Sequence, residues 1–315
     1  MCDVPGILVG HAHDSEALTG CTTVLFDRPA IVGVDVRGSS PGTRETARLA
    51  PTASVRRTDA ILLTGGSAFG LAAADGVVRY LEENGVGLDI GDVTIPLVSA
   101  AVLFDLMNGR SDIRPDARMG YEAASNAESG AFGQGNFGAG MGATVGKILG
   151  SERAMKGGVG SASFRLDEND NDGLTVGAIA AVNAFGDVRD ARNGEILAGP
   201  RLDDGTLGDT VELLPDAASR LRWGQNTTLC IVATNARLTK TETTKVAQMA
   251  HDGLARTIYP VHTTVDGDVA FAVSLGDIET APDIVGAWGA KAVSEAVMRA
   301  VGSAESVGGI VGIGG

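Results

Sequence analysis

Short runs of apolar and β-branched residues recur along the chain and predict its strands. Each run is bounded by glycine, proline or polar residues. The runs that we predict as strands are Thr22–Phe26, Ile31–Val36, Ala60–Leu63, Thr94–Val98, Leu174–Val182, Thr228–Thr234 and Val269–Val273. Nothing local in these runs decides between parallel and antiparallel pairing.

Segments with helical periodicity alternate with these runs. The first, Ser67–Glu83, follows a strand and a Gly-Gly turn, and we expect Ser67 to cap it and Gly85 to stop it. Thr239 and Glu242 have the spacing of a capping box, which predicts a helix to about Arg256. Further helical segments are Tyr121–Glu128 and Pro282–Val301, the latter stopped by Gly302.

Long strands mixed with long helices are typical of a layered α/β protein. The 45 glycines and only 4% aromatic residues indicate closely packed layers with many backbone-lined turns. Residues 133–146 are so rich in glycine that we expect an irregular segment there. Length alone allows two domains, but no repeat or low-complexity linker divides the 315 residues.

Composition excludes several classes of function. The formal net charge of −14 is opposite to that of most nucleic-acid binders. No apolar run reaches the roughly 18 residues of a membrane span, and the N-terminus lacks the basic start of a signal peptide. The three widely spaced cysteines, Cys2, Cys21 and Cys230, fit neither a disulfide framework nor a zinc site. We therefore expect a cytoplasmic protein without a nucleic-acid or membrane partner.

Two glycine motifs suggest nucleotide or anion binding but lack its context. Residues 133–138 match G-x-G-x-x-G, yet a helical segment precedes them and more glycine follows, whereas a dinucleotide fingerprint lies between strand and helix. The Gly65-Gly66 turn does lie between strand and helix, but it has no P-loop lysine, and Phe69 breaks G-x-S-x-G. The helix start could hold an anion or an oxyanion, or the turn could be purely structural. We expect no cofactor.

Two further patterns suggest a metal site. The acidic stretch 167–173 fails the calcium-loop spacing in either register and is better explained as a solvated hairpin tip. His11 and His13 would share one face of a strand, but no third ligand lies near them in the sequence. We expect no metal.

The chemistry that the sequence favours centres on Asn226-Thr227 at the head of an apolar strand. A threonine hydroxyl is a poor nucleophile without a nearby base. If the chain is cut before Thr227, the new α-amine on the same residue can act as that base. The hydroxyl could also make the cut by attacking the carbonyl of Asn226. The alternative is a plain loop that enters a strand.

A pair of carboxylates, Asp266 and Asp268, flanks Gly267 immediately before the last predicted strand. Such a pair can orient an amine or a hydroxyl and tune proton transfer. An Asp-Gly turn without a catalytic role fits the same residues equally well.

At this point the chain resembles the DmpA-type self-processing aminopeptidases and their relatives that hydrolyse nylon oligomers. The resemblance covers nearly the whole chain, and its motifs are specific in combination and in this order. They are LTGGSAFGL (63–71), VSAAVLFD (98–105), GAGMGATVGK (138–147), Val182-Asn183, Asn226-Thr227-Thr228 and Asp266-Gly267-Asp268.

The resemblance implies a four-layer α/β/β/α sandwich, similar to the N-terminal nucleophile hydrolases but with different connectivity. It implies self-cleavage between Asn226 and Thr227 of one domain, 1–315, into subunits 1–226 and 227–315 that stay together, typically as a homotetramer of processed protomers. Thr227 matches the nucleophile, Lys147 a neighbouring lysine and Asn183 an oxyanion-stabilising asparagine. Asp266 and Asp268 match the pair that supports the nucleophile and its amine.

Phe69 departs from family members that have tyrosine there, so one possible hydroxyl donor to substrate or oxyanion is absent. Asn-Thr-Thr and Asp-Gly-Asp are more similar to the nylon-oligomer branch than to the β-peptide-cleaving branch. We therefore expect an amidohydrolase of short peptides, amino-acid amides or related oligomers, with an endo-type 6-aminohexanoate oligomer hydrolase as one alternative. A non-catalytic binding protein that keeps the fold and a nucleotide-using enzyme are the others.

Overall fold

The structure, a computed structural model, describes residues 1–166, 173–217 and 226–314. Its centre is a nine-stranded sheet in the order β10-β11-β14-β16-β2-β4-β7-β3, with β1 paired to β2. The strands of this sheet are β1 (Ile7–Asp14), β2 (Thr19–Val36), β3 (Thr43–Arg44), β4 (Thr58–Thr64), β7 (Val98–Val102), β10 (Gly158–Leu166), β11 (Leu174–Asn183), β14 (Thr227–Ala236) and β16 (Val269–Ile278).

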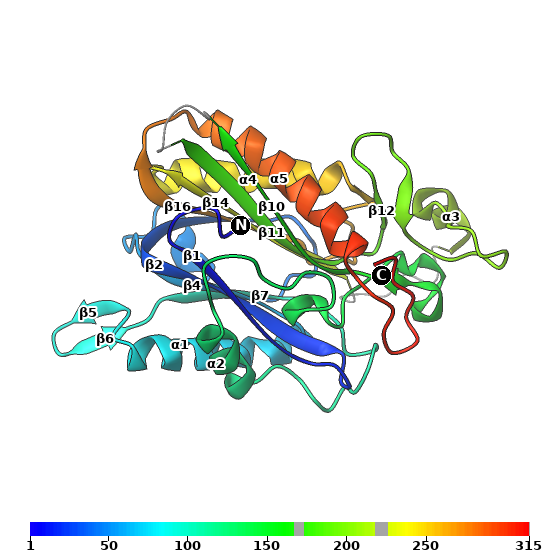
Figure 1. Ribbon diagram of the computed structural model, residues 1–315, viewed down its shortest axis with the longest axis horizontal. Helices are drawn as coiled ribbons and strands as arrows, with labels where there is room; N and C mark the ends of the chain where they lie inside the picture. Colours follow the sequence, from blue (N-terminus) through cyan, green and yellow to red (C-terminus); the bar gives the residue numbers. More distant parts are fainter. Residues whose placement is uncertain (167–172, 218–225, 315) are drawn as a thin grey trace.

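The strand β2 divides this sheet into two stacked layers. Its first part pairs with β1 and β4, and its second part, Ile31–Val36, pairs antiparallel with β16. In the other layer β14 runs parallel to β16 and antiparallel to β11. Figure 1 shows the two layers one above the other, with helices outside each. Smaller strands are β5 (Leu88–Ile90), β6 (Val93–Ile95), β8 (Thr144–Val145), β9 (Met155–Lys156), β12 (Asp187–Arg189), β13 (Ile196–Ala198) and β15 (Ile258–Tyr259).

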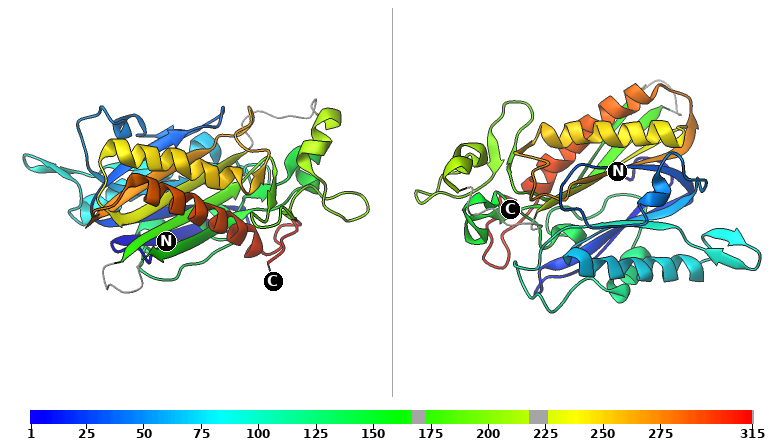
Figure 2. Two further views of the ribbon diagram at one scale, coloured as in Figure 1. Left: turned by 90° about the horizontal axis from the view of Figure 1, so that it is seen from above. Right: turned by 180° about the vertical axis from the view of Figure 1, so that it is seen from behind.

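Two pairs of helices complete the four-layer α/β/β/α sandwich. The pair α4 and α5 covers the layer of β10, β11, β14 and β16, and the pair α1 and α2 covers the layer of β1, β2 and β4 (Figures 1 and 2). A further helix among the described residues, α3, lies beside the sandwich (Figure 1). The helices are α1 (Ala73–Glu83), α2 (Ala117–Ser125), α3 (Thr210–Ala217), α4 (Lys240–Ala255) and α5 (Pro282–Gly302).

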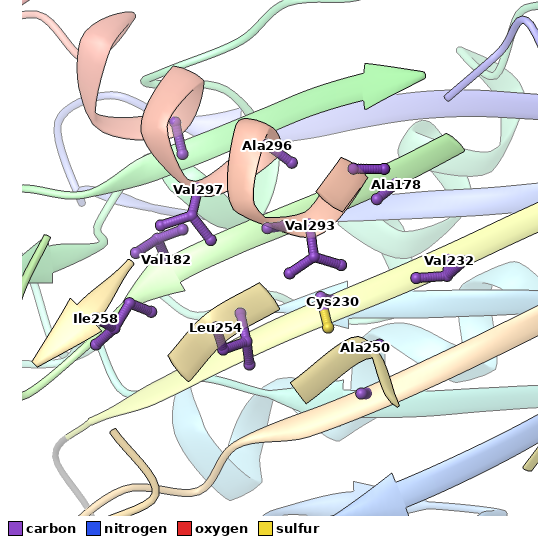
Figure 3. Packing of buried hydrophobic residues seen from close by; sticks show 14 of the residues in the cluster. Ala178, Val182, Cys230, Val232, Ala250, Leu254, Ile258, Val293, Ala296 and Val297 are labelled. Atoms are coloured by element: carbon purple, nitrogen blue, oxygen red, sulfur yellow. The ribbon is translucent and has the colours of Figure 1, made fainter. Parts of the chain in front are cut away.

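The alternation of side chains along the central strands explains the stacking. On β14, Cys230 and Val232 belong to the core beneath α4 and α5, whereas Leu229 and Ile231 belong to the core between the two sheet layers. Figure 3 shows Cys230 and Val232 beneath Ala250, Leu254 and Val293 of the two helices. Because both faces are buried, such a strand appears in the sequence as a continuous apolar run. The predicted four-layer fold is confirmed.

Several local predictions are confirmed. The predicted strands Leu174–Val182, Thr228–Thr234 and Val269–Val273 correspond to β11, β14 and β16. Helix α4 has the predicted capping box of Thr239 and Glu242.

Other local predictions are wrong. The predicted strand Thr94–Val98 is split, because Pro96 lies between β6 and β7 and cannot donate to a ladder. Ser67 does not cap its helix: it has a φ of +53° and begins a 3-10 turn, Ser67–Ala72, whose N-cap is Gly66. The segment predicted at Tyr121–Glu128 is shifted to α2, which Asp116 caps.

Candidate active site

All five predicted catalytic side chains lie at one edge of the sheet layer that α4 and α5 cover. Thr227 is the first residue of β14, and Asn183 is the last residue of β11. The two are direct partners in the antiparallel ladder. Asp266 and Asp268 immediately precede β16, which runs parallel to β14, so they reach the same edge. Lys147 starts a short 3-10 helix beside Asn183. The fold thus brings together residues that are distant in the sequence.

Asn226 and Thr227 are both buried, with only 3% and 4% of their surface exposed. The Thr227 hydroxyl donates a short hydrogen bond to the carbonyl oxygen of Asn226. The backbone N–H of Gly267 donates to the same oxygen at 2.9 Å. This carbonyl is therefore polarised by a fixed donor and lies next to a hydroxyl.

On one side of Thr227 lies the acid loop, residues 262–268. Asp268 accepts hydrogen bonds from the backbone N–H of Thr228 at 2.6 Å and from His262, through its backbone N–H at 3.0 Å and its Nδ1 at 2.7 Å. Asp266 accepts from the backbone N–H groups of Phe185 and Thr263, both at 3.2 Å, and from the Thr263 hydroxyl.

On the other side lies the lysine side, which consists of Lys147, Asn183 and their partners. The Lys147 Nζ donates to the side-chain oxygen of Asn183 at 2.8 Å and to its backbone carbonyl at 3.0 Å. The Asn183 side-chain oxygen also accepts from the backbone N–H of Thr144 at 3.0 Å, and its Nδ2 donates to the carbonyl of Phe104 at 2.9 Å. These contacts fix the orientation of the amide.

Burial changes the protonation of the charged groups. It lowers the pKa of Lys147 to about 7, although Asp266 and Asp105 oppose the change. Burial, followed by repulsion from Asp268, raises the pKa of Asp266 well above its ordinary value. Both groups therefore exchange protons closer to neutral pH than usual, as residues with acid–base functions do.

Some residues of the site escaped the sequence analysis. His262 and Thr263 hold the two carboxylates. Gly267 was noted only as the residue between the two aspartates, and its role as an N–H donor was missed. Two buried charged groups lie near Lys147: Lys156 was missed, and Asp105 was noted only as the end of the motif 98–105, without a role. The only signal for Lys156 would have been a lone lysine next to Ala154-Met155.

The other sequence motifs have different outcomes. Residues 133–138 precede only a short 3-10 turn, Gly138–Gly140, and not the long helix of a dinucleotide site. His11 and His13 lie on β1, where the Nδ1 of His11 is 2.9 Å from the Thr22 hydroxyl. The acidic stretch 167–172 lies outside the described residues. Among the residues that the structure describes, no three His, Cys, Asp or Glu side chains form a metal-binding group. Within these same ranges, no helix combines the length and apolar character needed to cross a bilayer.

The fold has solved counterparts among aminopeptidases. A β-aminopeptidase from a Burkholderia species aligns with a TM-score of 0.71 at 22% identity, covering 99% of this chain and 90% of that one. The L-aminopeptidase D-Ala-esterase/amidase of Ochrobactrum anthropi, described as a variant of the Ntn hydrolase fold, aligns with a TM-score of 0.74 at 20% identity, covering 97% and 86%. At these identities the likeness concerns the fold.

Sequence relatives extend the likeness to function. An uncharacterized aminopeptidase of Mycobacterium leprae is 41% identical over 98% of this chain and 91% of its own length. A 6-aminohexanoate-oligomer endohydrolase of a Kocuria species is 31% identical over 88% of this chain and 75% of its own. The protein is thus a hydrolase that acts on peptide or amide bonds. Residues 1–313 match the model of Peptidase family S58, and the chain belongs to that family.

Proposed function

We propose that this protein cleaves itself between Asn226 and Thr227 and then uses Thr227 as an N-terminal nucleophile to hydrolyse amide bonds of short peptides, amino-acid amides or related oligomers. The observation that best supports the proposal is the polarised Asn226 carbonyl, which accepts hydrogen bonds from both the Thr227 hydroxyl and the Gly267 N–H. A nucleophile and an oxyanion donor converge there on one peptide bond.

In the first stage, the Thr227 oxygen attacks the carbonyl carbon of Asn226. The neutral Lys147, whose pKa is lowered to about 7, takes up the hydroxyl proton. The oxyanion is held by the Gly267 N–H. The C–N bond then breaks, and the nitrogen of Thr227 leaves as an amine after taking a proton. Water hydrolyses the resulting ester, which yields the Asn226 carboxylate, the Thr227 hydroxyl and a free α-amine.

In the second stage, this amine removes the proton from the Thr227 hydroxyl, which attacks the amide carbon of a substrate. Asn183, together with backbone N–H groups, stabilises the oxyanion, and each such donor is worth roughly a hundredfold in rate. Asp266 tunes the amine, and Asp268 orients it through the backbone of Thr228. Water then releases the acyl group. Because Thr227 is 4% exposed in the intact chain, cleavage must precede access of substrate.

The test is an incubation at neutral pH followed by denaturing electrophoresis and intact mass analysis. We expect fragments 1–226 and 227–315 from the natural sequence and a single 315-residue chain from Thr227→Ala. Thr228→Val is the matched control, because the Thr228 hydroxyl is buried without a hydrogen-bond partner among the described residues. Two fragments from Thr227→Ala would disprove the nucleophile assignment. An uncut natural chain would favour a binding protein that keeps the fold.

A second candidate is an endo-acting hydrolase of 6-aminohexanoate oligomers. It is favoured by the identity of 31% to endohydrolases of that class, together with the Asn-Thr-Thr and Asp-Gly-Asp motifs. Comparing hydrolysis of amino-acid amides with that of 6-aminohexanoate oligomers separates the two candidates. Release of products from the interior of the oligomers, without turnover of the amides, would support the second.

We also propose that processed protomers assemble as cytoplasmic homotetramers. The three free cysteines are compatible with a reducing compartment. The mass of the processed protein in solution, measured by light scattering, tests the assembly: a mass four times 32.0 kDa is expected.

A further inference from the structure

A buried carboxylate, Asp105, lies next to the candidate active site without touching Thr227 in any described contact. It is 2% exposed. Its Oδ2 accepts from the Thr19 hydroxyl at 2.7 Å, and its Oδ1 accepts from the backbone N–H of Gly66 at 2.8 Å. A Cβ added at Gly65 would lie 2.0 Å from Oδ2, and one at Gly142 would lie 2.9 Å from it. Two glycines from separate segments therefore close around this carboxylate.

A buried ammonium, that of Lys156, organises the neighbouring carbonyl turn, residues 140–143. Lys156 is 1% exposed. Its Nζ donates to the carbonyl oxygens of Gly140, Met141 and Ala143 at 3.3, 2.6 and 2.9 Å. An ammonium has three N–H donors, so this one turn accounts for all of them. The turn is thus folded around the Lys156 nitrogen.

The carbonyl turn leads directly to the lysine side of the site. The next residue, Thr144, pairs with Lys156 between β8 and β9 and donates its backbone N–H to the side-chain oxygen of Asn183. Lys147 follows and donates to the same oxygen. Both donors therefore lie on the segment that follows directly from the turn that Lys156 holds.

We propose that Lys156 and Asp105 are positioning residues for the reaction proposed above. Lys156 fixes the carbonyl turn that presents Thr144 and Lys147 to Asn183. Asp105 lies between this turn and the Gly65-Gly66 turn, and its carboxylate balances the charge of Lys156. This assigns a role to one of the two glycine motifs that fit no nucleotide site: Gly65, like Gly142 of the carbonyl turn, leaves the space that Asp105 occupies. The proposal depends on the self-cleavage proposed for Thr227.

Charge provides a test that a purely structural role would not pass. The charged groups that act on the Lys147 ammonium are Asp266 in the acid loop, Asp105 after β7 and Lys156 on β9. In their charged forms Asp105 raises the pKa of Lys147, whereas Lys156 lowers it. Burial raises the pKa of Asp105 itself to about 6 and lowers that of Lys156 to about 7, so Asp105 carries its charge above that range and Lys156 below it. If neutral Lys147 takes up the hydroxyl proton, the rate of self-cleavage rises with pH through the pKa of Lys147. Replacing Asp105 and Lys156 by neutral residues must then move the midpoint of this rise in opposite directions.

The experiment follows cleavage of freshly translated full-length chain over a pH series by electrophoresis. We expect Lys156→Met to move the midpoint of the rate profile to higher pH and to slow cleavage at pH 7 about tenfold or more. Asp105→Asn is expected to move the midpoint to lower pH. The control Thr23→Val removes a buried hydroxyl of β2 that has no hydrogen-bond partner among the described residues; it changes no charge and should leave the midpoint unchanged.

The outcomes separate this inference from the proposed function. If the natural chain is cleaved but Lys156→Met and Asp105→Asn shift the midpoint in the same direction or not at all, the positioning role is wrong. If Lys156→Met does not fold, the comparison of Asp105→Asn with Thr23→Val decides, because only the former is expected to shift the midpoint. If the natural chain is not cleaved at any pH, the proposed function fails before this inference is reached.

Discussion

The two sides of Thr227 are constructed in different ways. The acid loop obtains most of its order within seven residues, since His262 and Thr263 bind the carboxylates of Asp268 and Asp266. The lysine side is assembled from segments that are far apart, because Asn183 contacts Phe104, Thr144 and Lys147. A local motif can place a carboxylate by itself, whereas the lysine side exists only after the whole sandwich has packed.

The largest effect that we expect comes from adding one carbon atom to the acid loop. In Gly267→Ala, the new Cβ would lie 2.7 Å from the Thr227 hydroxyl oxygen and 2.5 Å from the carbonyl oxygen of Ser40. The nucleophile must then move, and a misplacement of this kind costs about a hundredfold in rate. Intact mass analysis over time measures the loss of cleavage.

The matched control is Gly302→Ala at the end of α5, where an added Cβ would meet nothing within 4 Å. This variant should be cleaved at the natural rate. Cleavage of Gly267→Ala at the natural rate would mean that the close contact between this loop and the nucleophile does not govern the reaction.

The second effect distinguishes the two sides by the pH dependence of folding stability in the uncleaved Thr227→Ala chain. Asp266 has a raised pKa in the folded chain. Its contribution to the free energy of unfolding is therefore complete below pH 3.8 and is lost as the pH rises through the pKa of the folded state. Lys147 has a pKa lowered to about 7 in the folded chain. Its contribution to the free energy of unfolding is therefore complete above pH 10.5 and is lost as the pH falls through about 7.

Urea unfolding at several pH values measures both slopes. Adding Asp266→Asn should flatten the loss of stability as pH rises above 3.8, and adding Lys147→Met should flatten the gain between pH 7 and 10.5. Each change is expected to amount to about 1 to 3 kcal/mol. Identical pH profiles for all three chains would show that burial does not shift these two groups.

The same contrast explains how much of the molecule the sequence predicts. The strands Leu174–Val182 and Thr228–Thr234 were identified because burial on both faces makes them continuous apolar runs. By contrast, β1 and β10 were missed, because glycine, histidine and serine interrupt their apolar pattern. Glycine is needed at Gly10 and Gly160 because a Cβ there would collide with the backbone of a packed helical segment. Close packing of layers thus removes the pattern from which a strand would be recognised.

The candidate site shows the same limit. Asn226-Thr227 and the two aspartates are visible as short motifs, whereas Lys147 and Asn183 entered only through the family resemblance. His262 and Lys156 were not identified, and Asp105 appeared only as the last residue of a family motif, without a role. Asp105 and Lys156 act on partners that chain folding brings near, so no local spacing reveals them.

The smallest effect that we expect tests how strongly the acid loop depends on its own histidine. His262 has a φ of +56°, a conformation that asparagine and glycine adopt more readily than most residues. The Nδ2 of an asparagine can replace the histidine Nδ1, which lies 2.7 Å from Asp268, whereas glycine offers no side-chain donor. Losing one hydrogen bond to a charged group costs about 1.5 kcal/mol, or roughly tenfold in rate.

We therefore expect cleavage of His262→Gly to be about tenfold slower, and that of His262→Asn to remain within about threefold of the natural rate. Both variants keep the backbone N–H that also binds Asp268 and both lose the edge contact with the His251 ring, so equal rates would assign the effect to that contact and not to the carboxylate.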